Sequence, residues 1–308
     1  MGTRGSALAR AQSGMVAAEI TRMTGIEVET VLVKTEGDHL SVEGKAPPGG
    51  DLAGVFTRAL DAALREGKID FAVHSLKDVP TEGFTDLVLA AVPEREDARD
   101  ALVVATRHAG VDAVRGLPKG ARVATSSPRR VAQLLRLRPD LVTVPMPGNV
   151  DTRLQRLEEG RADALLLAVS GLVRLGRSER ITRRLDVDEF LPAPGQGALA
   201  LVCRADDAGT RGALKGWDHA ATRAAVLAER ALLSALRGGC RAPVGTIATV
   251  ENGTLKLRAR VLSLDGRESF EGEGQGSSER PEVVGRDVAT SLERQGAARL
   301  VAAAHEVA

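Results

Sequence analysis

The sequence has 308 residues, 43% of them hydrophobic, which is enough for two or three compact domains. A net charge of +1, with five Phe, one Trp and no Tyr, argues against a nucleic acid or an anionic membrane as partner. The two cysteines lack the number and spacing of a disulfide framework or a metal site. Because no signal-peptide pattern or bilayer-spanning apolar run is present, we expect a cytoplasmic protein.

The first part of the chain alternates between helix-like and strand-like stretches. Residues 8–24 are predicted to form an amphipathic helix, and residues 26–33 a strand. Residues 53–66 carry apolar side chains at helical spacing with Gly67 as the stop, and a strand over 69–73 follows. This alternation predicts an α/β fold with a mainly parallel sheet.

A similar pattern occurs twice in the chain. Residues 64–75 and 157–170 each show a helix end, Glu-Gly, a basic residue, Asp, and then an apolar strand that reaches Ser. Two domains of similar plan would produce this echo, and so would chance reuse of a common helix–Gly–strand joint. Hinges are predicted at residues 93–99 and 191–197. Two crossings between α/β lobes would leave a cleft with a hinge behind it.

The composition changes from about residue 218 onward. An Ala-rich helix is predicted over about 220–236 and strands over 246–250 and 254–261, with one long helix at the C-terminus. This part is expected to form a smaller α+β domain.

Residues 125–130 (Thr-Ser-Ser-Pro-Arg-Arg) follow a predicted strand and open a helix. Ser127 suits the N-cap and Pro128 the first helical position. Arg129 and Arg130 then lie in the first turn, where cations are unfavourable unless an anion binds in front of them. Two solvated arginines on a surface helix are the alternative. The preceding hydroxyls favour an anion site built from side chains and backbone N–H groups.

Residues 74–80 (His-Ser-Leu-Lys-Asp-Val-Pro) follow the strand predicted over 69–73. Ligands of open α/β sheets bind beyond the carboxyl ends of the strands. Lys77 can hold a carboxylate there while Asp78 transfers protons. Taken alone, the segment also fits a polar turn with a local ion pair. His74 is assigned no role.

Three more strand-to-helix joints carry basic or hydroxyl side chains. Residues 148–153 place Arg153 near a helix start, Arg174 lies just beyond another strand, and Arg4 and Ser6 precede the first helix. In an α/β fold such joints converge on one cleft. The pattern predicts a small ligand with several carboxylates or phosphates.

The two cysteines have different surroundings. Cys240 follows two glycines and precedes Arg241, and nearby cations favour the nucleophilic thiolate. The absence of a neighbouring catalytic histidine argues against a protease-type dyad and permits a covalent anchor. Cys203 lies in the apolar strand 198–203 and is expected to be inert core.

Together these segments resemble the porphobilinogen deaminase family from end to end. The resemblance is carried, in chain order, by residues 3–9, 72–80, 125–130, 148–153, 168–176, 191–198 and 238–245. It implies two lobes like those of type II periplasmic binding proteins, with a hinge and cleft, and a smaller C-terminal α+β domain. The implied boundaries are 1–95 with 197–215 for the first lobe, 96–196 for the second, and 216–308 for the C-terminal domain.

The resemblance also implies the chemistry. A dipyrromethane cofactor would be attached through a thioether to Cys240. Four porphobilinogen molecules would lose ammonia and join head to tail on this primer, and hydrolysis would release hydroxymethylbilane for heme biosynthesis. The partner is then a small-molecule substrate, and we expect a monomer.

Site residues are assigned by matching position. Asp78 corresponds to the catalytic aspartate of the family. Cofactor binding is assigned to Cys240, Lys77, Arg129, Arg130, Arg153, Ser127, Asp38 and Thr125. Substrate binding is assigned to Arg4, Ser6, Arg174, Gln196, Phe56 and Ser75.

Two features depart from the family pattern. Pro147 occupies a position where the family usually has Arg, and the loop 49–56 is altered and carries Asp51. Two other interpretations therefore stay open: a divergent paralogue with altered or lost activity, and a non-enzymatic carboxylate-binding module. The retained Asp78 and Cys240 oppose the first, and the additional C-terminal domain opposes the second.

Overall fold

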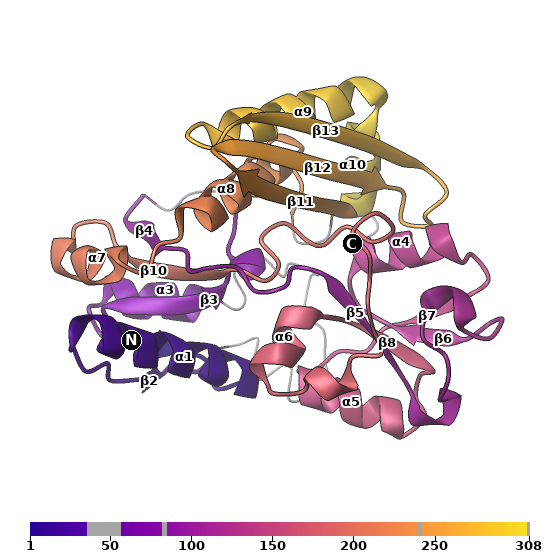
Figure 1. Cartoon of the computed structure of the whole chain (residues 1–308), viewed down its shortest axis with the longest axis horizontal. Helices are drawn as coiled ribbons and strands as arrows, with labels where there is room; N and C mark the ends of the chain where they lie inside the picture. The colour runs from indigo at the N-terminus through magenta and orange to yellow at the C-terminus, as the bar shows by residue number, and fades with distance from the viewer. Residues whose placement is uncertain (36–56, 82–84, 240–241, 307–308) are drawn as a thin grey trace.

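The computed structural model of the chain describes residues 1–35, 57–81, 85–239 and 242–306. Within these residues the chain forms two five-stranded sheets and one three-stranded sheet, each covered by helices (Figure 1). The five-stranded sheets are the centres of two α/β lobes, and the three-stranded sheet is the centre of a C-terminal domain. This arrangement confirms the predicted fold class.

The first lobe is built on the sheet β2-β1-β3-β10-β4. Helix α1 covers one face with Val16 and Ile20, and α3 covers the other with Leu60 and Leu64. The strands are β1 (Gly2–Thr3), β2 (Val31–Leu32), β3 (Phe71–Ser75), β4 (Leu87–Ala91) and β10 (Leu199–Arg204), and the helices are α1 (Ala7–Thr24), α3 (Arg58–Arg65) and α7 (Ala208–Lys215).

The second lobe is built on the sheet β7-β6-β8-β5-β9. Leu157 of α5 packs on one side of this sheet and Leu134 of α4 on the other. The strands are β5 (Asp100–Val104), β6 (Arg122–Ala124), β7 (Val142–Val144), β8 (Ala164–Ala168) and β9 (Arg183–Arg184), and the helices are α4 (Pro128–Leu137), α5 (Val150–Glu158) and α6 (Val169–Arg174). The described residues of the two lobes also form four short 3-10 helices: η2 (Leu76–Asp78), η3 (Thr106–His108), η4 (Val114–Gly116) and η5 (Ser178–Arg180).

Each five-stranded sheet is mainly parallel, as predicted: four of its strands run in one direction, and one strand, β10 in the first lobe and β5 in the second, runs against them. β10 is antiparallel to both β3 and β4, and β5 is antiparallel to β8 and β9. The parallel pairs are confined to β1 with β2 and β3, and β6 with β7 and β8. β5 and β10 are the strands that follow the two crossings between the lobes. A strand that arrives from the other lobe does not need the crossover helix that joins parallel neighbours.

The C-terminal domain packs its helices on the antiparallel sheet β11-β12-β13 (Figure 1, orange to yellow). Strand β13 was not predicted, because its alternating glycines lack a strand-like apolar face. These glycines allow close packing: a Cβ at Gly274 would lie 2.6 Å from the side chain of Val288 on α9. The strands are β11 (Val244–Glu251), β12 (Thr254–Leu262) and β13 (Ser269–Ser277), and the helices are α8 (Ala220–Ala235), α9 (Pro281–Gln295) and α10 (Ala297–Glu306).

Two further predictions of secondary structure differ from the structure. The single long C-terminal helix is divided into α9 and α10 by Gly296, whose φ of 104° is incompatible with a continuous helix. The strand predicted over 26–33 is reduced to Val31–Leu32, an edge strand with both side chains exposed. The expectation for Cys203 is confirmed, because its side chain is fully buried in the first lobe.

A buried ion pair connects the two segments that cross between the lobes, residues 93–99 and 191–197, to the C-terminal domain. Nη1 and Nη2 of Arg95 lie 2.7 and 3.0 Å from the carboxylate oxygens of Glu229 on α8, which has no exposed surface. The same carboxylate accepts hydrogen bonds from the backbone N–H groups of Gly195 and Ala248. Both crossing segments and β11 therefore meet at one charged group.

Candidate functional site

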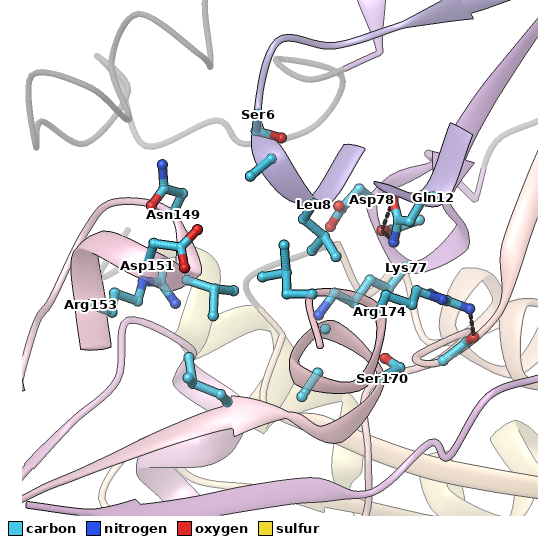
Figure 2. Close-up of a pocket in the computed structure, with 18 of the residues that line it drawn as sticks. Ser6, Leu8, Gln12, Lys77, Asp78, Asn149, Asp151, Arg153, Ser170 and Arg174 are labelled. Atoms are coloured by element: carbon cyan, nitrogen blue, oxygen red, sulfur yellow. Dashed lines mark hydrogen bonds between the residues drawn. The ribbon is translucent and has the colours of Figure 1, made fainter. Parts of the chain in front are cut away.

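A cavity of about 220 Å³ lies between the two lobes, and its walls come from five separate joints of the chain (Figure 2). The first lobe contributes the start of α1 and the turn after β3, and the second contributes the starts of α4 and α5 and the short helix α6. The side chains that carry charge or hydrogen-bonding groups are Arg4, Ser6, Gln12, Ser75, Lys77, Asp78, Arg130, Asn149, Asp151, Arg153, Ser170 and Arg174. The predicted convergence of these joints is therefore confirmed.

The cavity is cationic. Five cationic side chains and two carboxylates line it. Burial lowers the pKa of Lys77 to about 8, although the neighbouring Asp78 opposes this shift. Burial, reinforced by Arg130 and Arg156, lowers the pKa of Arg153 to about 10. Cations held in such proximity with little water favour a ligand that supplies several negative charges.

The turn after β3 places Lys77 and Asp78 side by side in the cavity (Figure 2). β3 is a buried strand that pairs with β10, and it ends at Ser75, where the short helix η2 begins. Leu76 is buried beneath this turn, so the polar residues on either side of it face the opening. A carboxylate beside an ammonium group can transfer a proton while the ammonium binds an anion.

Arg129 and Arg130 bind the same carboxylate, but Arg130 reaches the cavity and Arg129 does not. Both guanidinium groups bind Asp100, with Arg129 Nη1 at 2.6 Å from Oδ2 and Arg130 Nη2 at 2.8 Å from Oδ1. Arg129 is 3% exposed and also donates to the carbonyl oxygen of Leu191, so it lies behind the cavity rather than in its wall. Arg130 lines the cavity.

Asp100 is the centre of this buried cluster. Burial alone would raise the pKa of Asp100, but Arg129 and Arg130 outweigh burial and hold it well below its usual range. Nε2 of Gln196 donates to the same carboxylate at 2.9 Å. Gln196 has no exposed surface, and it therefore contacts the arginine cluster rather than the open cavity.

The start of α5 presents Arg153 to the opposite wall of the cavity (Figure 2). Gly148 has a φ of 112°, and Oδ1 of Asn149 caps the helix by accepting from the N–H of Thr152 at 2.9 Å. Nε of Arg153 is buried without a hydrogen-bond partner. Nearby, Arg156 donates to the carbonyl oxygen of Pro147 at 2.7 Å.

Arg174 marks the point where the crossing segments pass each other. Its Nη2 donates to the carbonyl oxygen of Gly197 at 2.6 Å. Gly197 has a φ of 89°, and a Cβ there would lie 2.4 Å from the carbonyl oxygen of Glu96. Only glycine therefore permits this crossing at the floor of the cavity.

The predicted site residues fall into three groups. Eight line the cavity: Arg4, Ser6, Ser75, Lys77, Asp78, Arg130, Arg153 and Arg174. Four are not in its wall: Thr125, Ser127, Arg129 and Gln196. Ser127 is the N-cap residue of α4, but its side chain makes no capping hydrogen bond; its N–H donates to Thr125 Oγ1. Asp38, Phe56 and Cys240 lie outside the described residues.

Sequence reasoning missed several residues of the site. Gln12 lies on α1, two turns into the helix, and its Nε2 donates to the Ser75 hydroxyl at 3.1 Å. Ser170 and Asp151 also line the cavity. The helical spacing from Leu8, which also lines the cavity, could have indicated Gln12, because residues four apart lie on one face of a helix.

The described residues contain no cluster of His, Cys, Asp and Glu suited to a metal ion. Among them, no helix combines the length and apolar character that crossing a membrane requires.

Comparison with known proteins gives matches along nearly the whole chain. Residues 1–212 match the family model "Porphobilinogen deaminase, dipyromethane cofactor binding domain", and residues 223–294 match "Porphobilinogen deaminase, C-terminal domain". The porphobilinogen deaminase of Thermobifida fusca is 47% identical over 98% of this chain and 95% of its own length. Porphobilinogen deaminase 1 of Streptomyces coelicolor is 46% identical over 98% of this chain and 96% of its own length.

Solved structures show a weaker similarity over part of the chain. The periplasmic VFT2 domain of BvgS from Bordetella pertussis is 20% identical, with a TM-score of 0.39, over 66% of this chain and 74% of that domain.

Proposed function

The chain belongs to the porphobilinogen deaminase family, and on this premise we propose that its cationic cavity binds the pyrrole chain that this family extends. Family members are transferases of tetrapyrrole and heme biosynthesis. They join four porphobilinogen molecules with loss of ammonia and release hydroxymethylbilane. The observation that supports the proposal is the convergence of five cationic side chains with Asp78 in one cavity.

The residues of the cavity fit a dipyrromethane cofactor. When bound, this group supplies the primer to which new pyrrole units are joined. Its rings carry acetate and propionate groups, which match the guanidinium of Arg153 and its unpartnered buried Nε. Lys77 and Arg130 would bind further carboxylates, and Cys240 would hold the group covalently.

Asp78 has two tasks in this proposal. Loss of ammonia from porphobilinogen breaks the carbon–nitrogen bond, and both bonding electrons leave with the nitrogen. Positive charge then develops on the pyrrole ring, where a fixed carboxylate stabilises it. The same carboxylate can exchange a proton with the departing amine. Lys77 beside it would hold a substrate carboxylate and keep the ring in position.

The remaining polar residues would bind the incoming substrate. Arg4, Ser6, Ser75 and Arg174 line the first-lobe side and floor of the cavity. Pro147 contributes no charge, but its carbonyl oxygen fixes Arg156 close to Arg153. Arg153 itself lines this wall, which is therefore cationic without an Arg at position 147, and this favours an active enzyme over a paralogue that has lost activity.

We expect the chain to be divided into two lobes and a C-terminal domain. The lobes would comprise residues 1–95 with 197–215 and residues 96–196, and the C-terminal domain residues 216–308. Small-molecule binding would require no second subunit, so we expect a monomer that acts in the cytoplasm.

Intact-mass spectrometry tests this proposal. The purified protein should carry an added mass of one dipyrromethane, and incubation with porphobilinogen should add successive single pyrrole units. Cys240→Ser should show neither addition, while Cys203→Ser, which changes a buried thiol of the first lobe, should show both. A wild-type mass equal to that of the bare chain, before and after incubation, would support the non-enzymatic binding module instead.

The lowered pKa of Lys77 predicts a pH dependence. Because burial brings this pKa to about 8, the ammonium form is lost as the pH rises through that value in the free enzyme. kcat/KM for porphobilinogen should therefore fall above about pH 8 in a pH–rate profile. Lys77→Arg should move this decline to higher pH, since a guanidinium stays protonated. Identical alkaline limbs for the two proteins would contradict the assignment.

A further inference from the structure

A second, smaller cavity of about 60 Å³ adjoins the first beside Asp78. The two share the side chains of Arg4, Ser6, Leu8, Gln12, Ser75 and Asp78. The walls that belong to the smaller cavity alone include Thr57, Val73 and His74. We call this space the side cavity. A water-sized molecule needs roughly 10–15 Å³ on the same measure, so the side cavity has room for a small polar group.

Two buried polar groups line the side cavity. His74 is 5% exposed, and its Nε2 makes no hydrogen bond. Thr57 is 1% exposed, and although it is the N-cap residue of α3, its Oγ1 does not cap that helix; the hydroxyl lies beside the Asp61 carboxyl, which can accept a hydrogen bond from it while the hydroxyl lone pairs stay free to accept. Buried polar atoms are rarely left unpaired in folded proteins, so the His74 nitrogen indicates a ligand that supplies the missing partner.

The neutral imidazole of His74 and the hydroxyl oxygen of Thr57 both suit a ligand that donates N–H groups. Burial, with a contribution from Arg4, lowers the pKa of His74 to about 4, so the imidazole is neutral near neutral pH. A neutral imidazole has one nitrogen that accepts a hydrogen bond, and a hydroxyl oxygen also accepts. Burial raises the pKa of the adjacent Asp61 to about 6, against the opposing effect of a hydrogen bond from the Thr57 hydroxyl.

The side cavity differs from the main one in its charge. Five cationic side chains line the main cavity, whereas Arg4 is the one cation among the described residues that line the side cavity, and Asp78 opposes it. Carboxylates are therefore drawn to the main cavity. An aminomethyl group attached to the same ring would find acceptors and a negative charge in the side cavity.

We propose that the side cavity receives the aminomethyl group of porphobilinogen and the ammonia that leaves from it, with His74 Nε2 and Thr57 Oγ1 as acceptors. This inference rests on the proposed function. Asp78 stands at the boundary of the two cavities, where it contacts the amine while the carbon–nitrogen bond breaks. The bonding electrons depart with nitrogen into the side cavity, and the ring stays in the main cavity. Leaving group and nucleophile are thereby kept apart.

Two ligands that differ in one group test this assignment. The first is porphobilinogen, and the second is a competitive pyrrole with the same acetate and propionate but a methyl in place of the aminomethyl group. Thr57→Val removes the hydroxyl and keeps the shape of the side chain. It should lower kcat/KM for porphobilinogen about tenfold and leave the inhibition constant of the methyl pyrrole unchanged. Thr57→Ser, which keeps the hydroxyl, should restore kcat/KM.

A matched control and a second readout complete the test. Thr290→Val changes an exposed threonine of α9 and should alter neither constant. Nitrogen-15 NMR of the histidine rings, assigned with His74→Gln, should show Nε2 of His74 without a proton. A protonated Nε2, or equal effects of Thr57→Val on both ligands, or no effect on either, would overturn the inference while the proposed function stands. A wild-type chain that releases no ammonia from porphobilinogen would overturn both.

Discussion

Replacing Asp78 with Asn is expected to lower kcat for porphobilinogen consumption by about 100- to 1,000-fold, because one carboxylate supplies both charge stabilisation and proton transfer. Asp78 lines both the main cavity and the side cavity, next to Lys77. Asn has nearly the same shape but carries no charge and does not accept a proton. The measurement is the rate of ammonia release at saturating substrate.

The Asp78 experiment needs proof that the variant is loaded and folded. Its intact mass should include the dipyrromethane. Asp86→Asn removes a carboxylate of the same lobe that pairs with Arg65 on the surface, and it should retain wild-type kcat. An Asp78→Asn protein that keeps more than about a tenth of the wild-type rate would contradict the role given to this residue.

Replacing Asp100 with Asn is expected to reduce the free energy of unfolding by about 3–5 kcal/mol. The carboxylate is fully buried and is bonded to the guanidinium groups of Arg129 and Arg130. Its removal leaves two buried cations without a counter-charge. The change can be measured from urea unfolding followed by circular dichroism, with the midpoint compared at equal slope.

The pH dependence of stability gives an independent check on Asp100. Its pKa in the folded protein is well below the usual range, so the unfolded chain binds a proton at higher pH than the folded one. The stabilisation is complete above the unfolded pKa, about 3.9, and is lost as the pH falls through that value toward the folded pKa. The unfolding midpoint of the wild type should therefore decline below about pH 4 more steeply than that of Asp100→Asn.

The controls separate burial from charge removal. Asp86→Asn breaks an ion pair in which both side chains are about half exposed, and it should leave the urea midpoint unchanged. A loss of stability in Asp100→Asn no larger than in Asp86→Asn would show that the arginine cluster does not depend on this carboxylate.

The convergence of the site could be predicted from sequence because its residues follow strands. Lys77 and Asp78 stand just after β3, Arg153 lies in the first turn of α5, and Arg174 ends the short helix that follows β8. These joints meet at one edge of each sheet. No information on side-chain direction is needed for such a prediction.

That Arg129 and Gln196 lie outside the cavity wall could not be predicted from their positions in the sequence. Arg129 and Arg130 are adjacent on α4, so their side chains point about 100° apart, and only packing decides which one faces the cavity. The partner that fixes both, Asp100, stands 29 residues before Arg129 at the start of β5, without any local sign of a buried cluster. His74 was assigned no role for a similar reason: its surroundings come from α1 and the start of α3, far from it in sequence.

The position of β10 has a consequence for synthesis on the ribosome. This strand lies between β3 and β4, so the sheet of the first lobe stays incomplete until Arg204 has been translated. The second lobe has all its strands, and its buried Phe190, before that point. Although its sequence comes later, the second lobe is therefore expected to fold first. Until β10 is synthesised, the edges of β3 and β4 lack their hydrogen-bonding partner, and a chaperone that binds nascent chains would protect them.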